Sequence, residues 1–119
     1  MTRDHVARWG RAGALYDLVA SIAFVTPWTG AFAMDLIGTP HTTATRMFAT
    51  LFGTVVVMWS VVRWLKPERL LITADTVGRA LFCCWFTWAL LQGETKAIAV
   101  FLVLELFWGA AQLRALTRR

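Results

Sequence analysis

Residues 97–113 have the sequence AIAVFLVLELFWGAAQL, an apolar run with a single carboxylate, Glu105, near its middle. A helix of about 20 apolar residues crosses the roughly 30 Å hydrocarbon core of a bilayer, so this run predicts a slightly short membrane span. A charged group at the centre of a span costs about 2.5 to 3.5 kcal/mol on insertion scales. Glu105 therefore predicts a partner or a ligand inside the membrane.

The composition of the whole chain indicates the same surroundings. Of its 119 residues, 58% are hydrophobic, whereas about 45 to 50% is typical of soluble domains. Three further windows are long and apolar enough to span, at residues 12–34, 44–65 and 72–91. Short connections with turn residues make neighbouring spans antiparallel. We predict an all-α membrane protein, in which residues 1–119 form a single domain, an up-down-up-down four-helix transmembrane bundle.

Basic residues gather on one side of this predicted bundle. The side with both termini and the second connection holds Arg3, Arg8, Arg11, Arg63, Lys66, Arg69, Arg114, Arg118 and Arg119, and the other side holds Arg46 and Lys96. Because loops rich in Lys and Arg stay in the cytoplasm, we predict a multi-pass protein of the bacterial inner (plasma) membrane with both termini cytoplasmic. Topology also accounts for the net charge of +5, so no nucleic-acid partner is predicted.

Pro27 falls inside the first predicted span. Proline removes one backbone hydrogen bond of a helix and bends it, and membrane helices tolerate such a bend. We therefore expect residues 12–34 to form one helix, kinked near an outer end that Trp28 marks at the interface.

Polar residues recur in the spans at spacings that share a helix face. These residues are Asp17 in the first span, Asp75 and Arg79 in the third, and Glu105, Trp108 and Gln112 in the fourth. Arg79 is spaced to pair with Asp75 and is also placed to reach Glu105. Three acids around one arginine predict that at least one carboxyl is neutral or bound to a cation.

Two functions are the main explanations of this polar set, and a membrane enzyme with Glu105 and Asp75 as acid and base is a third alternative. The first is binding, with or without transport, of a small amphiphilic or cationic ligand in an intramembrane cavity centred on Glu105. Trp108 and either Trp85 or Trp88 would form its aromatic walls, because indole rings attract cations. The alternative is a structural or accessory subunit whose buried polar groups fix helix packing or recruit a partner protein. Membrane lipid is a partner in either case, and a homodimer or higher homo-oligomer would enlarge the cavity.

Enzyme chemistry lacks its usual sequence signals. The chain has no HExxH, GxSxG, P-loop or GxGxxG pattern. Its two histidines, His5 and His41, fall on opposite predicted sides of the membrane, so one chain does not offer a paired-histidine haem site. Cys83 and Cys84 are adjacent and are interpreted as packing residues. We therefore predict no cofactor and no metal site, and the sequence does not favour an enzyme.

The C-terminal two-thirds of the chain resembles a group of small four-span bacterial inner-membrane proteins, loosely the DoxX-like superfamily. The resemblance rests on His41, residues 53–59 (GTVVVMW), Pro67, Asp75, Gly78, Arg79, Leu81, Phe82, Gly93, Glu105, Trp108, Gly109 and Gln112. It implies the four-span architecture and a shared constellation of Asp75, Arg79 and Glu105, and it implies no particular activity.

Overall fold

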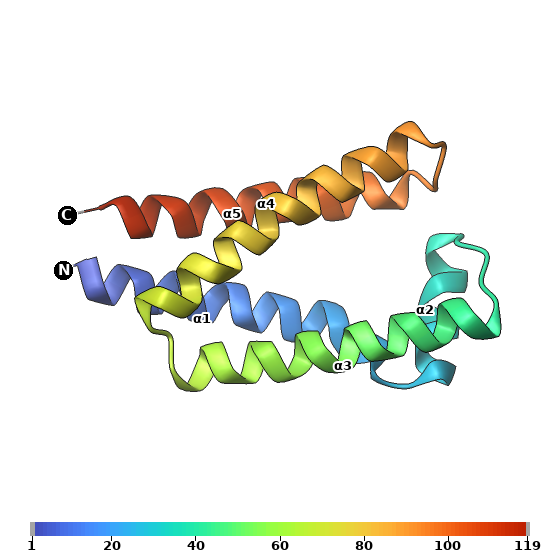
Figure 1. Ribbon diagram of the computed structural model, residues 1–119, viewed down its shortest axis with the longest axis horizontal. Helices are drawn as coiled ribbons and strands as arrows, with labels where there is room; N and C mark the ends of the chain where they lie inside the picture. Colours follow the sequence, from blue (N-terminus) through green and yellow to red (C-terminus); the bar gives the residue numbers. More distant parts are fainter. Residues whose placement is uncertain (1, 119) are drawn as a thin grey trace.

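The computed structural model describes residues 2–118, in which all the regular secondary structure is helical (Figure 1). The elements are α1 (Thr2–Ser21), the short 3₁₀ helix η1 (Ile22–Val25), α2 (Pro27–Ile37), α3 (Thr43–Leu65), α4 (Arg69–Leu91) and α5 (Ala97–Thr117). The prediction of an all-α protein is confirmed.

The last three predicted spans correspond to α3, α4 and α5. These helices have 23, 23 and 21 residues and are long and apolar enough to cross a membrane. At 1.5 Å per residue, 23 residues extend about 35 Å, which exceeds the hydrocarbon thickness. Three helices of this length and composition are typical of a membrane protein. The bent pair of residues 5–25 and α2 adds a fourth span if it is counted as one.

The prediction that residues 12–34 form one kinked helix is wrong. The chain turns by 109° between residues 5–25 and α2. Thr26 is extended, with φ −130° and ψ 150°, as the residue before a proline prefers. Pro27 then begins α2, where its missing N–H costs no helical bond, and the Thr26 hydroxyl accepts a hydrogen bond from the Thr29 N–H at 3.2 Å. Pro27 therefore starts a new helix instead of bending an existing one.

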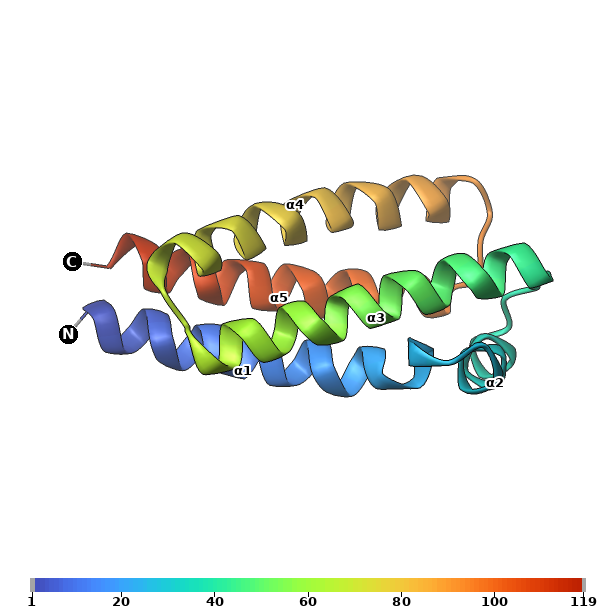
Figure 2. The ribbon, with the colours of Figure 1, turned by 60° about the horizontal axis from the view of Figure 1, so that its bottom comes forward.

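The long helices pack as two pairs. α4 lies along α5 and α1 lies along α3, while contacts between α1 and α5 join the pairs (Figure 2). Both termini lie at one end of the molecule, and α2 lies towards the other end (Figure 1). α3 and α4 diverge from the loop that joins them (Figure 1), and residues of both helices line the cavity described below.

The distribution of side chains is the reverse of that in a water-soluble protein. The buried residues include Arg63, Asp75, Arg79, Glu105 and Gln112, whereas large apolar side chains along α3, α4 and α5 face outwards. Polar groups inside and apolar groups outside are expected where lipid is the solvent. A small apolar core consists of Val6 near the beginning of α1, Ile72 near the beginning of α4 and Leu116 near the end of α5.

Candidate functional site

Arg79 on α4 is the centre of a buried network of charges. Its side chain is 3% exposed and donates to three carboxylates, each from a different helix. Nε lies 2.9 Å from Asp75 Oδ2, Nη1 lies 2.7 Å from Glu105 Oε2, and Nη2 lies 2.7 Å from Asp17 Oδ2. Nη2 also donates to the carbonyl of Gly13 at 3.3 Å. The structure thus brings together the four charged residues that the sequence analysis selected.

A second arginine, Arg63 on α3, belongs to the same network. It is 0% exposed, and its Nη2 lies 2.5 Å from Asp17 Oδ2. Its Nη1 is 3.1 Å from Asp75 Oδ2, which makes an ion pair without a hydrogen bond. The sequence predicts Arg63 among the basic residues at the membrane surface, but the structure places it inside the protein. Arg63 follows Ser60 by three residues, a spacing that puts both side chains on one face of the helix, and Ser60 is also buried. This spacing was the sequence signal for a buried Arg63.

The charges in this network do not balance. We refer to Asp17, Arg63, Asp75, Arg79 and Glu105 as the charged cluster. Three carboxylates and two guanidinium groups give a formal charge of 2 − 3 = −1. The expectation of three acids around one arginine is therefore corrected to three acids around two.

The carboxylates of the charged cluster differ in how many of their oxygens accept hydrogen bonds. Asp75 accepts from Arg79, from Trp59 Nε1 at 2.9 Å and from Gln112 Nε2 at 3.0 Å. By contrast, Oε1 of Glu105 and Oδ1 of Asp17 accept no hydrogen bond from the residues that the structure describes. Neither of these two oxygens is fully enclosed by protein. The open acceptor positions of the charged cluster therefore belong to Glu105 and Asp17.

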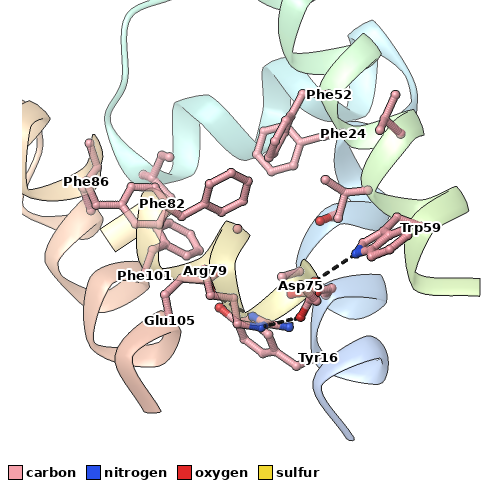
Figure 3. A pocket seen from close by; sticks show the side chains of 18 of the residues that line it. Tyr16, Phe24, Phe52, Trp59, Asp75, Arg79, Phe82, Phe86, Phe101 and Glu105 are labelled. Atoms are coloured by element: carbon pink, nitrogen blue, oxygen red, sulfur yellow. Dashed lines mark hydrogen bonds and ion pairs between the residues drawn. The ribbon is translucent and has the colours of Figure 1, made fainter. Parts of the chain in front are cut away.

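A cavity of about 460 Å³, which Asp17 and Glu105 both line, lies between α1, α3, α4 and α5 (Figure 3). Asp17, Asp75, Arg79 and Glu105 line one part of it. The remaining lining is mostly apolar and includes Phe24, Phe52, Phe82, Phe86 and Phe101. Four of these rings form a chain, with centroids 5.7 Å apart for Phe52 and Phe82, 6.2 Å for Phe82 and Phe86, and 6.4 Å for Phe86 and Phe101.

The tryptophans selected from the sequence do not line this cavity. Trp85 and Trp88 lie on α4 with 63% and 57% exposure. Trp108 stacks on Tyr16 with a centroid distance of 5.6 Å. The aromatic walls are therefore phenylalanines, and Tyr16 is a lining residue that the sequence analysis missed. Its position next to Asp17 was the only signal for it.

Gln112 lies near the charged residues, as its spacing from Glu105 on one helix face predicted, but it does not line the cavity. Its Nε2 donates to Asp75 and to Thr76 Oγ1, at 3.0 and 3.1 Å, and the residue is fully buried. It therefore positions Asp75 from α5. Trp59, which the sequence analysis missed, holds the other oxygen of Asp75 and also lines the cavity.

Comparisons of the chain with protein-family models, with curated proteins and with solved structures gave no significant match. The DoxX-like resemblance therefore stays a prediction. Within residues 5–118, no group of three or more His, Cys, Asp or Glu side chains is arranged to hold a metal ion.

Proposed function

We propose that this protein is an integral membrane protein that binds a small amphiphilic cation in the cavity beside Glu105. The observation that carries the proposal is the excess of one carboxyl group over the guanidinium groups of the charged cluster, with Asp17 and Glu105 lining an otherwise mostly apolar cavity. A hydrogen-bonding cation such as an alkylammonium would neutralise the excess negative charge. Its N–H groups would also donate hydrogen bonds to the vacant carboxylate oxygens. An unpaired charge inside a protein is costly, so such a ligand gains affinity by compensating it.

The size and walls of the cavity support the same ligand class. About 460 Å³ falls within the range of small-molecule sites, which are mostly apolar with a few polar groups that fix orientation. The chain of phenylalanine rings would hold the apolar part of the ligand, and ring faces attract a nearby cation by about 0.5 to 2 kcal/mol. Because this attraction is strongest away from water, the cation would bind at the junction of rings and carboxylates.

We also propose that the chain crosses the membrane four times. We assign the first crossing to α1 with η1, and the others to α3, α4 and α5, which keeps the up-down-up-down order. The position of both termini at one end of the molecule supports an even number of crossings (Figure 1). α2 would lie at the outer interface, since its Trp28, Phe32 and Leu36 are exposed. The basic residues at the termini favour the cytoplasm of a bacterium for that end.

Binding can be tested with a series of matched chains in lipid nanodiscs. Isothermal titration with decylamine, decanol and decanoate, corrected with empty nanodiscs, compares a cation, a neutral alcohol and an anion of one tail length. We expect decylamine to bind tightest. Glu105→Gln should weaken it at least tenfold, which corresponds to about 1.4 kcal/mol. Glu94→Gln, the same change at an exposed residue of the loop before α5, should leave it unchanged.

Equal affinities for the three probes, or equal effects of the two substitutions, would overturn a cation site at Glu105. The homodimer or higher oligomer stays part of the proposal, and light scattering corrected for detergent measures it directly.

A second function, as a structural or accessory subunit, is favoured by one observation. Arg79 joins α1, α4 and α5 through its three carboxylate partners, so the charged cluster also fixes how these helices pack. On this alternative the wild type would take up no more decylamine than empty nanodiscs, while Glu105→Gln would still lower the melting temperature. The same titration therefore separates the two functions.

A further inference from the structure

A second cavity, of about 450 Å³, lies between the beginning of α1 and the end of α5. It shares no lining residue with the cavity beside Glu105. Arg8 and Trp9 of α1 face Phe107, Arg114 and Arg118, which follow along α5 and its end. The residues that line this cavity belong to the beginning of α1 and to the end of α5, and these two segments lie at the end of the molecule that carries both termini (Figure 1).

The described residues that line this second cavity carry a net positive charge. Arg8, Arg114 and Arg118 contribute a formal charge of +3, and none of the described residues lining the cavity is acidic. None of the three guanidinium groups forms an ion pair with another described residue. This contrasts with Arg63 and Arg79, whose charges are paired inside the charged cluster. The arginines of the second cavity are therefore available to an anion.

The uncharged residues that line the second cavity indicate a binding site for an anion at the membrane interface. Trp9 and Phe107 provide aromatic surface, and Ala110, Ala111 and Ala115 leave room between the two helices. Tryptophan near the end of a membrane helix is typical of the level of the headgroups. Phe107 is half exposed on the outside of α5, where an acyl chain can lie against it. The cavity thus combines a basic pocket with an apolar surface beside it.

We propose that this basic cavity binds a phosphate-bearing anion, independently of the cation site beside Glu105. Guanidinium groups bind phosphate oxygens through paired N–H donors, and basic pockets between membrane helices bind anionic headgroups. The two sources of the phosphate are the headgroup of an anionic phospholipid, such as phosphatidylglycerol, and free phosphate in the water phase. The apolar surface at Phe107 gives the lipid the additional contact.

The test uses the full chain in detergent and counts bound lipid by native mass spectrometry. Phosphatidylglycerol and phosphatidylcholine with identical acyl chains are titrated, and phosphatidylglycerol is expected to bind at least tenfold tighter. The variant Arg8→Gln with Arg114→Gln should bind phosphatidylglycerol about thirtyfold more weakly. Each basic residue near an anionic lipid contributes about 1 kcal/mol, and 1.4 kcal/mol corresponds to a factor of ten.

The matched control is Lys66→Gln with Lys96→Gln, which removes the same charge at two exposed residues outside the cavity. Circular dichroism verifies that both double variants fold, as expected for exposed positions. Inorganic phosphate is then added as a competitor. Retention of phosphatidylglycerol assigns the site to the lipid, and its full displacement at millimolar phosphate assigns the site to free phosphate. Equal binding of the two lipids, or equal losses in the two double variants, would overturn the proposal.

Discussion

Arg63 offers the sharpest test of the charged cluster. It is fully buried, and the Arg63→Gln variant removes its charge and replaces the guanidinium group with a shorter side chain that ends in a neutral amide. Two carboxylates then lose a partner, since Arg63 lies 2.5 Å from Asp17 and 3.1 Å from Asp75. The charged cluster would change from a formal charge of −1 to −2 inside the protein.

The expected magnitude follows from the burial of these pairs. Unit charges about 4 Å apart attract by about 4 kcal/mol at an effective dielectric constant of 20. Removing one partner of a buried ion pair costs about 3 to 5 kcal/mol, because the other charge remains buried and uncompensated. We expect Arg63→Gln to lower the free energy of unfolding by about 3 kcal/mol. For a chain of this size that corresponds to a fall of about 10 °C in melting temperature.

Thermal unfolding in detergent, followed by circular dichroism, provides the measurement. Lys66→Gln is the matched control three residues later, because Lys66 is exposed and its 3.4 Å pair with Glu68 contributes less than about 1 kcal/mol. A double-mutant cycle with Asp17→Asn isolates the pair. In the double variant the charged cluster returns to −1, so we expect a coupling energy of about 1 to 3 kcal/mol.

Two results would refute this reasoning. If Arg63→Gln melts within about 2 °C of Lys66→Gln, Arg63 is not a buried member of the charged cluster. If the effects of Arg63→Gln and Asp17→Asn simply add, the contact between them carries no energy, even if each residue matters alone.

Two further substitutions test the turn between α1 and α3. At Gly53 an added Cβ would lie 2.6 Å from Cβ of Phe24, so Gly53→Ala should cost about 1 to 3 kcal/mol by overpacking, whereas Gly78→Ala meets no atom within 4 Å and should be neutral or stabilising in a melting experiment. Thr26→Ala removes the cap at the start of α2 and should cost about 1 kcal/mol, seen as faster hydrogen exchange at Thr29 and its neighbours but not in α5.

The limits of the sequence analysis are clearest at Pro27. Hydropathy alone predicted α3, α4 and α5, because a long apolar run has one stable conformation in lipid. Hydropathy could not distinguish a kinked helix from a break between two helices, because the sequence is apolar in both cases. The signal for a break was local. Thr26 before Pro27 is a capping residue followed by proline at the first helical position, a pattern that begins a helix.

The site was predictable where spacing along one helix decided it. Arg79, Phe82 and Phe86 are three and four residues apart, and all three line the cavity. Trp85 and Trp88 were selected for their ring chemistry although they lie off that face, and they are outside the cavity. The contact of Arg63 with Asp17 joins residues 46 positions apart. It depends on the register of α3 against α1, which single-helix spacing does not determine.

The charged cluster links the packing of the helices to the proposed binding site. In lipid the hydrophobic effect does not hold helices together, so buried polar contacts and close packing set their arrangement. Arg79 contacts α1, α4 and α5, and Arg63 extends the network to α3. A cation at the vacant oxygen of Glu105 would draw charge from the carboxylate that Arg79 also holds, and it would weaken that ion pair. Binding would then redistribute the contacts that hold α5 against α4, so ligand affinity and helix packing should change together in any variant of Glu105 or Arg79.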